Sequence, residues 1–307
     1  MTQALIWIGF IAFIIGMLVL DLKVLQKKDH DIRVKEALLW TLFWIVLSLL
    51  FNVGVYFYMG KDYALEFLTG YLIEKALSVD NIFVFILIFT YFDIPPRFQH
   101  KILFWGILGA IIMRATFILA GVAIIQRLHW AIYVLGAFLV YIGIKMAFEK
   151  EKEIHPDKNP ALRAFNKVYP VDYGYKGGNF FIKKAGKRLA TPIFVTLIVI
   201  ETTDIVFAID SIPAILSITQ HPFIVFTSNI FAILGLRALY FAVSGIMKLF
   251  RFLNYGLSLI LVFVGVKMLI SEFYKIPVAI ALSVVGGLLV GSILLSVLIP
   301  DKNKKQQ

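Results

Sequence analysis

Repeated apolar runs of about 20 residues are the feature that most constrains what this chain can fold into. A helix of that length spans the hydrocarbon core of a bilayer. The chain is 60% hydrophobic, whereas a soluble domain is roughly 45–50% apolar. The sequence therefore predicts an all-α polytopic membrane protein, a single transmembrane domain with about nine transmembrane helices at 4–22, 36–59, 64–90, 101–125, 129–148, 191–217, 222–246, 253–272 and 277–299.

The Lys and Arg residues outside these runs lie mostly on one side of the predicted membrane. Counted over the loops and the tail, 22 fall on one side and 3 on the other. Because basic residues accumulate in cytoplasmic loops, we expect a multi-pass protein of the cell (inner) membrane, with its N-terminus outside and its C-terminus in the cytoplasm. The net charge of +11 is then mainly topogenic, with the lipid bilayer as a partner and no nucleic acid.

Five carboxylates lie inside runs that are otherwise apolar enough to cross a bilayer. Glu74 and Asp80 belong to one run, and Glu201, Asp204 and Asp210 belong to another. Each ionised side chain at membrane depth costs several kcal/mol, from about 2.5 to above 10 depending on the method. A cation site or a proton relay is the function that such residues indicate by default.

The two acidic runs open an internal repeat. Glu74 precedes Asp80 by six residues, as Asp204 precedes Asp210, and a small polar residue follows each second acid. The matching later positions are Asn81 with Ser211, Arg114 with Arg237, and residues 141–146 with 263–268. Spans 3–5 (about 64–148) would then repeat as spans 6–8 (about 191–272) in inverted orientation, a 3+3 plan that is recurrent in secondary transporters. The runs 4–22, 36–59 and 277–299 would be extra helices.

Helix geometry limits which acids of the second run can share one ion. Glu201 and Asp204 are three residues apart and share a helix face. Asp204 and Asp210 would point about 120° apart, with about 9 Å of rise between them. Pro213 cannot donate to the carbonyl of Ile209, so we expect a kink beside Asp210 that exposes a backbone oxygen to a hard cation.

The available ligands are oxygens, which suit magnesium, calcium and manganese, with sodium and protons as further options. Five acids carry −5, and the charge-balancing residues Lys75, Arg114 and Arg237 carry +3, which leaves the −2 that a divalent cation would neutralise. For the two arginines we favour ion pairing with the acids over direct contact with substrate. Asn81, Ser211, Asn229 and Asp21 are additional candidate ligands. No resident cofactor is expected, because the metal would be the transported substrate.

Other kinds of site are excluded or weakly indicated. With no cysteine and with five histidines scattered in or beside loops, thiolate and multi-histidine metal sites are not expected. No metalloprotease, P-loop or nucleophile motif occurs, so no enzyme activity is predicted. Gly287 and Gly291 would permit close helix packing and suggest a homodimer. The cytoplasmic loop 149–190 is interpreted as a solvated connector.

Three stretches combine apolar residues with polar positions: GYLIEKALSVDN at 70–81, DIVFAIDSIPA at 204–214 and NIFAILGLR at 229–237. Through them nearly the whole chain resembles the TerC family of membrane proteins, and within it the Alx-type members. The resemblance implies a plasma-membrane protein that exports manganese, from a superfamily of small-solute exporters, together with the historical label of tellurium resistance. It places the family's acidic motif positions on Glu74, Asp80, Glu201, Asp204 and Asp210.

These patterns lead to one functional hypothesis and two alternatives. The hypothesis is a manganese(II) exporter that works by alternating access, with protons competing for the same carboxylates. The first alternative is a non-transporting membrane scaffold or assembly factor, in which the acids form buried structural pairs. The second is a calcium or sodium antiporter, because manganese over other hard cations comes from the resemblance and not from the spacing.

Overall fold

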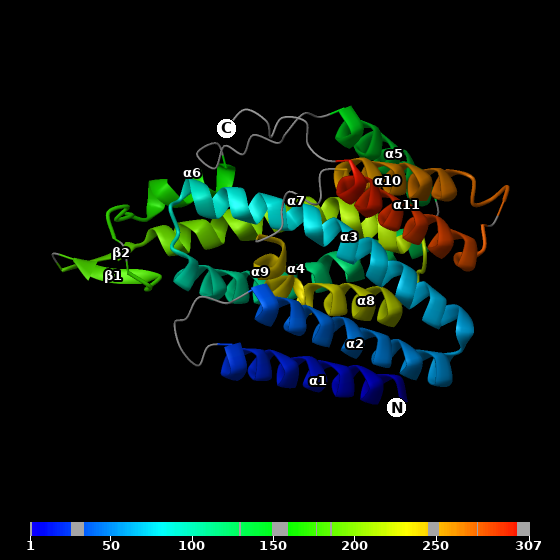
Figure 1. Cartoon of the computed structure of the whole chain (residues 1–307), viewed down its shortest axis with the longest axis horizontal. Coiled ribbons are helices and arrows are strands. Elements are labelled where there is room, and N and C mark those ends of the chain that lie inside the picture. The colour runs from blue at the N-terminus through cyan, green and yellow to red at the C-terminus, as the bar shows by residue number, and fades with distance from the viewer. Residues whose placement is uncertain are drawn as a thin grey trace.

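The computed structural model describes residues 2–25, 34–128, 130–148, 159–175, 177–184, 186–244, 252–274 and 276–299. The side chains of Asp21, Asp80 and Asp210 lie outside this described part, although their backbones lie in helices. Helices that run alongside one another make up the body of the molecule (Figure 1). The first four are α1 (Thr2–Leu25), α2 (Val34–Met59), α3 (Lys61–Tyr91) and α4 (Pro96–Arg127).

The remaining elements are helices of the bundle, interrupted once by a small unit outside it that consists of α6 and two strands. They are α5 (Ala131–Phe148), α6 (Pro160–Val168), β1 (Phe181–Lys184), β2 (Lys187–Ala190), α7 (Pro192–Leu216), α8 (Pro222–Leu234), α9 (Leu236–Ser244), α10 (Leu253–Leu269) and α11 (Val278–Leu298). Each predicted apolar run thus coincides with one helix or, for 222–246, with the pair α8 and α9.

Four of these helices are long and apolar enough to cross a membrane on their own: Val34–Met59, Pro96–Ile124, Pro192–Leu216 and Val278–Leu298. The pair α8 and α9 would make a fifth span, bent by 41° at the break between them. Shorter apolar helices cover 5–20, 132–148 and 255–269. The predicted class, an all-α polytopic membrane protein, is confirmed, whereas the count of nine spans stays a prediction.

Local sequence signals account for where several helices begin. Proline occupies the first helical turn of α4, α7 and α8, where its missing amide hydrogen costs nothing. Gly60 alone separates α2 from α3 and has a φ of 103°, a conformation that favours glycine. This single residue turns the chain back, so that α2 and α3 pack against each other.

The kink expected at Pro213 stays a prediction. Helix α7 runs as one α-helix from Pro192 to Leu216, with Pro213 inside it. Pro213 lies in the last turn, and its own carbonyl still accepts a hydrogen bond from the Ser217 amide at 3.0 Å. A break between helices lies at Gly235, between α8 and α9.

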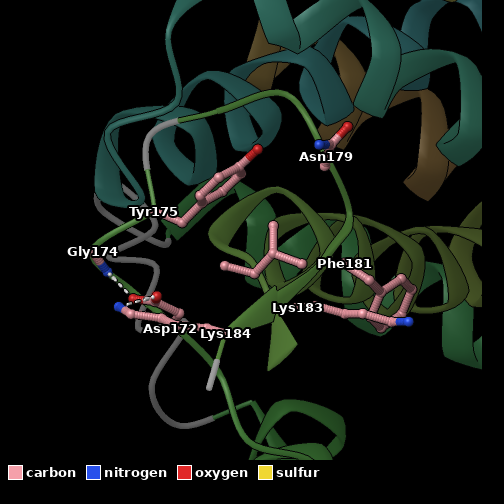
Figure 2. Close-up of a pocket in the computed structure, with 8 residues that line it drawn as sticks. Asp172, Gly174, Tyr175, Asn179, Phe181, Lys183 and Lys184 are labelled. Atoms are coloured by element: carbon pink, nitrogen blue, oxygen red, sulfur yellow. Dashed lines mark hydrogen bonds and ion pairs between the residues drawn. The ribbon is translucent and has the colours of Figure 1, made fainter. Parts of the chain in front are cut away.

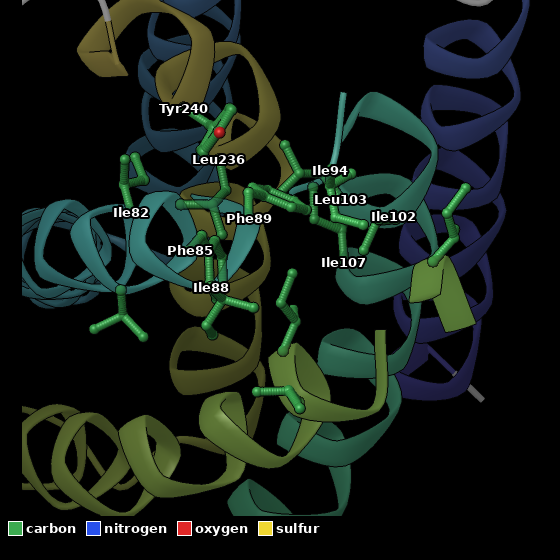
Figure 3. Packing of buried hydrophobic residues seen from close by; sticks show 14 of the residues in the cluster. Ile82, Phe85, Ile88, Phe89, Ile94, Ile102, Leu103, Ile107, Leu236 and Tyr240 are labelled. Carbon is green, nitrogen blue, oxygen red and sulfur yellow. The ribbon is translucent and has the colours of Figure 1, made fainter. Parts of the chain in front are cut away.

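Apolar packing closes one end of the bundle around the second half of α3. Figure 3 shows residues of α3, α4 and α9 meeting there, among them Phe85, Phe89, Ile102 and Leu236. The same cluster includes residues from the first half of α7 and Leu162 of α6. A polar contact crosses it, since Tyr240 Oη donates a hydrogen bond to Gln99 Oε1 at 2.8 Å.

The close contacts between α5 and α10 are reciprocal, because each helix places a glycine against the backbone of the other. Gly143 and Gly265 are matched positions of the predicted repeat, at an offset of 122 residues. At each of them, backbone atoms of the opposite helix lie within 3.0 Å of where a Cβ would be. The contacted residues are related by the same offset: Ser258 and Val262 face Gly143, and Gly136 and Val140 face Gly265.

The described part of the 149–190 loop is folded rather than a solvated connector. Helix α6 is capped by Asn159, whose Oδ1 accepts from the amides of Ala161 and Leu162. Strands β1 and β2 form an antiparallel hairpin, and Phe181 packs on Phe194 with ring centroids 4.5 Å apart. The sequence reasoning missed this unit because its contacts are aromatic and long-range, while its composition is that of a charged loop.

Candidate functional site

Arg114 of α4 is the centre of a buried polar network. Its guanidinium is 1% exposed, and it grips Asp204 of α7 with two bonds, Nη2 to Oδ1 at 3.0 Å and Nε to Oδ2 at 3.2 Å. Its Nη1 also donates to Glu74 Oε1 on α3, and Glu74 is fully buried. One cation thus joins an acid from each half of the predicted repeat.

Two neutral side chains complete this network. Asn229 of α8 donates from Nδ2 to Glu74 Oε2 at 3.1 Å. Arg114 Nη1 lies 3.4 Å from Asn229 Oδ1 and 3.4 Å from Ser211 Oγ, at the far limit of hydrogen bonding. Four helices, α3, α4, α7 and α8, therefore contribute side chains to one centre, which we call the Arg114 network: Glu74, Arg114, Asp204, Ser211 and Asn229.

Glu201 occupies a separate, half-buried position beside this network. It lies on α7 one turn before Asp204, and its carboxylate fits against Gly109 of α4. A side chain at position 109 would overlap with the carboxylate, so glycine is required for this close approach. Asn159 Nδ2, at the start of α6, donates to the neighbouring Thr202 at 2.7 Å, so the folded loop reaches α7 next to Glu201.

Lys75 does not join the acids with which the sequence grouped it. It follows Glu74 on α3, but its Nζ donates to the carbonyl of Ala232 on α8 at 3.1 Å. Arg237 of α9 is buried, at 1% exposure. Sequence reasoning could not find the Ala232 contact, because a backbone carbonyl leaves no mark in the sequence.

The other predicted ligands fall into two groups. Asn81 is buried on α3, one turn beyond Ser78, whose Oγ is buried and has no hydrogen-bond partner among the described residues. Asp80, Asp210 and Asp21 were predicted ligands whose side chains lie outside the described part of the structure. Within the described residues, no group of three or more His, Cys, Asp or Glu side chains is arranged to hold a metal.

An open hollow of about 610 Å³ lies elsewhere, beside the β-hairpin and outside the apolar helices (Figure 2). Lys184 donates to Asp172 at 2.7 Å there, and this hydrogen bond holds the pKa of Asp172 below its ordinary value. The Gly174 amide donates to the same carboxylate. This hollow contains none of the predicted ligands.

The profile of the integral membrane protein TerC family matches residues 59–305, which include the whole Arg114 network. The chain belongs to the TerC family. This confirms the resemblance found in the sequence and the membrane-embedded nature of the chain. A comparison with solved structures found no match.

Curated relatives in the TerC family align with almost the entire chain. An uncharacterized membrane protein of Myxococcus xanthus, STKORF319, is 50% identical over 293 residues, covering 95% of this chain and 92% of the relative. Alx of Salmonella typhi is 43% identical, covering 98% and 97%. Alx of Escherichia coli strain K12 is 42% identical, covering 99% and 97%. Both Alx proteins carry the provisional name of a membrane-bound redox modulator.

Proposed function

We propose that this TerC family member is a secondary transporter that exports a divalent cation, Mn²⁺ by preference, through alternating access. The observation that carries the proposal is the Arg114 network, in which Glu74 and Asp204 meet inside the bundle with under 5% of either residue exposed. Carboxylates buried at membrane depth mark ion pathways and proton relays. Bringing them together from two separate parts of the chain is what a shared transport site requires.

The chemistry of this network suits exchange between cations. In the described state the two carboxylates hold a guanidinium, so an incoming divalent cation has to displace Arg114 from Glu74 and Asp204. Ser78 Oγ, which has no described partner, and Asn229 Oδ1 supply further oxygen atoms of the kind that hard cations prefer. Protons would compete for the same carboxylates and would couple export to proton entry.

An inverted 3+3 repeat would supply the alternating access. The reciprocal contacts of Gly143 and Gly265 support it, because a two-fold axis between α5 and α10 predicts this exchange of partners. The packing of whole helices has the same two-fold relation. Helix α3 of the first block packs on α8 of the second, as α7 of the second packs on α4 of the first. A broken helix such as the α8–α9 pair is also typical of transporters built this way.

We propose the cell (inner) membrane as the location, with the N-terminus outside. In Figure 1 the N-terminus and the β-hairpin lie at opposite ends of the bundle, as this orientation requires. The choice of Mn²⁺ over Mg²⁺ or Ca²⁺ rests on the resemblance to TerC exporters, because oxygen ligands suit all three ions.

A scaffold or assembly function is the second candidate, and one observation favours it. Arg114 already satisfies both Glu74 and Asp204, which is what a purely structural network needs. The redox role in the names of the Alx relatives is a third idea. With no cysteine in these 307 residues, thiol exchange by this chain is excluded, so such a role would be indirect.

The test is ion flux into proteoliposomes that contain the purified protein. Uptake of Mn²⁺, Ca²⁺, Mg²⁺ and Na⁺ is measured with and without a pH gradient, for the wild type, Glu74→Gln and Asp204→Asn. These changes keep the shape of the side chain, remove one negative charge each and replace one accepting oxygen by a donating NH₂ group. Asp172→Asn, a carboxylate outside the apolar helices, is the matched control.

We expect Mn²⁺ flux in the wild type and in Asp172→Asn, and its loss in both network variants, with all four proteins eluting as folded species. A wild type that carries Ca²⁺ or Na⁺ but no Mn²⁺ would establish the antiporter instead. If no cation moves, and the amide variants differ from wild type only in stability, export is wrong and the scaffold function is favoured.

A further inference from the structure

Lys75 and Glu74 are neighbours on α3, yet they contact different parts of the molecule. Glu74 belongs to the Arg114 network, whereas Lys75 Nζ donates to the Ala232 carbonyl in the last turn of α8, at 3.1 Å. The ring of Tyr71 lies 5.9 Å from the same ammonium. The Lys75 ammonium is thus the cation that meets the C-terminal end of a half-helix in the interior of the bundle.

The end of α8 needs such a cation for a physical reason. The last carbonyls of any α-helix have no amide partners within the helix, and the aligned peptide dipoles make that end partly negative. Here the end lies among buried residues, since Ala232, Ile233 and Leu234 are all at most 3% exposed. Water is excluded, so a donor with a positive charge stabilises this helix end more than it would at a surface.

The surroundings at the break are shaped around the ammonium group. A Cβ at Gly235 would lie 2.9 Å from Lys75 Nζ and 3.0 Å from Trp44 Cβ. Trp44 is itself buried, at 1% exposure. Glycine at position 235 therefore leaves room for one small cation between the helix end and the indole of Trp44.

Removal of the Lys75 ammonium would leave the Ala232 carbonyl without this donor, at a helix end that is partly negative. Half-helix C-terminal ends of this kind coordinate monovalent cations in secondary transporters.

We propose that the Lys75 ammonium is a tethered cation that permanently fills a monovalent-cation site at the C-terminal end of α8. Its ligands are the Ala232 carbonyl and the face of Tyr71, and Gly235 and Trp44 form its walls. When the lysine side chain is removed, this site binds free NH₄⁺ or K⁺, the small cations that most resemble an alkylammonium group. The inference does not depend on which ion the Arg114 network carries.

The experiment is a thermal unfolding titration of the purified protein in detergent, which requires no transport assay. Wild type, Lys75→Ala and Lys75→Met are compared in NH₄Cl, KCl and NaCl against choline chloride at constant ionic strength. Lys75→Ala opens the site, while Lys75→Met removes the charge but refills most of the space. We expect the Tm of Lys75→Ala to rise by about 3 to 5 °C in NH₄Cl or KCl, the shift of one ligand well above its Kd. Wild type and Lys75→Met should not respond.

A second measurement tests the proposal even if Lys75→Ala fails to fold. Gly235→Ala places a methyl group against both the ammonium and Trp44, so its effect on Tm is measured in the wild type and in Lys75→Met. A larger loss in the wild type than in Lys75→Met supports the proposal, because only the wild type has an ammonium to displace. Equal losses in both backgrounds, or a Lys75→Ala protein whose Tm ignores every monovalent cation, would overturn it.

Discussion

At the scale of single residues, Arg114 determines the electrostatics of the bundle centre. Its bidentate bond to Asp204 and its bond to Glu74 neutralise acids that would otherwise face each other in a low dielectric. Removing one partner of a buried ion pair is far more costly than the pair's net contribution to stability, since the remaining charge is left without compensation. Single and double substitutions in the network should therefore have non-additive effects on the free energy of unfolding.

Arg114→Gln is expected to lower the free energy of unfolding by about 3–5 kcal/mol, because two carboxylates lose their cation. The change is measured by denaturant or thermal unfolding in detergent. Arg127→Gln, at the exposed end of the same helix, is the control and should change little. Adding Glu74→Gln to Arg114→Gln should recover part of the loss. Strict additivity of the two changes would contradict the network.

Gly109 is the second residue whose role can be tested by a small change. Gly109→Ala puts a methyl group where the Glu201 carboxylate lies, so the acid has to move away from α4. Because the overlapping atoms are the far end of a flexible side chain, we expect a loss at the low end of the range for overpacking, about 1 kcal/mol. Gly54→Ala, with open space around it, is the control. A Gly109→Ala protein as stable as the control would mean that the Glu201 carboxylate can adopt another position without loss of stability.

At the scale of elements, one surface ion pair joins Lys184 of β1 to Asp172 in the preceding loop, and it titrates outside the apolar helices. Lys184 and the Gly174 amide both donate to Asp172, and the lysine lowers the carboxyl pKa. A lowered folded-state pKa gives a stabilisation that is present above the unfolded-state value, about 3.9, and is lost as the pH falls through the folded-state pKa.

Asp172→Asn should therefore make cleavage in the hairpin modestly faster at neutral pH, and the wild type should approach that rate only in acid. Limited proteolysis between residues 172 and 190, followed by mass spectrometry, measures this. Asp62→Asn, an exposed carboxylate at the start of α3, is the control with the same change of charge. Unchanged cleavage in Asp172→Asn would show that aromatic packing alone holds the hairpin.

The contact between α5 and α10 gives a symmetric prediction. Gly143→Leu and Gly265→Leu each force a side chain into the backbone of the opposite helix, so the two changes should destabilise the protein to a similar extent. Gly286→Leu on α11, which faces open space, is the control. Unfolding temperatures in detergent measure all three. A large loss at one glycine with none at the other would argue against the two-fold relation.

At the scale of the whole molecule, the cysteine-free sequence makes the topology directly testable. Lys61→Cys, beside the α2–α3 turn, should react with a membrane-impermeant thiol reagent only from outside the cell. Lys183→Cys, in the hairpin, should react only after the membrane is opened. Because the wild type has no thiol, any labelling comes from the introduced residue. The reverse pattern would invert the proposed orientation and with it the direction of export.

The sequence predicted much of this arrangement from patterns along the chain. Apolar length placed the helices, and proline and glycine placed several of their ends. The cost of intramembrane charge singled out Glu74, Asp204 and Arg114 before their contacts were known. The prediction failed at the folded loop, whose aromatic contacts have no periodicity.

Membrane class, helix positions and the identity of the buried charged residues are determined by the sequence itself, since hydropathy and charge act on each segment separately. The tertiary structure decided which charges meet. Arg114 reaches Glu74 across 40 residues, Asn229 reaches Glu74 across 155, and Lys75 reaches Ala232 across 157. Such partners depend on how helices pack. Adjacent residues such as Glu74 and Lys75 contact different parts of the bundle because successive helical positions point about 100° apart.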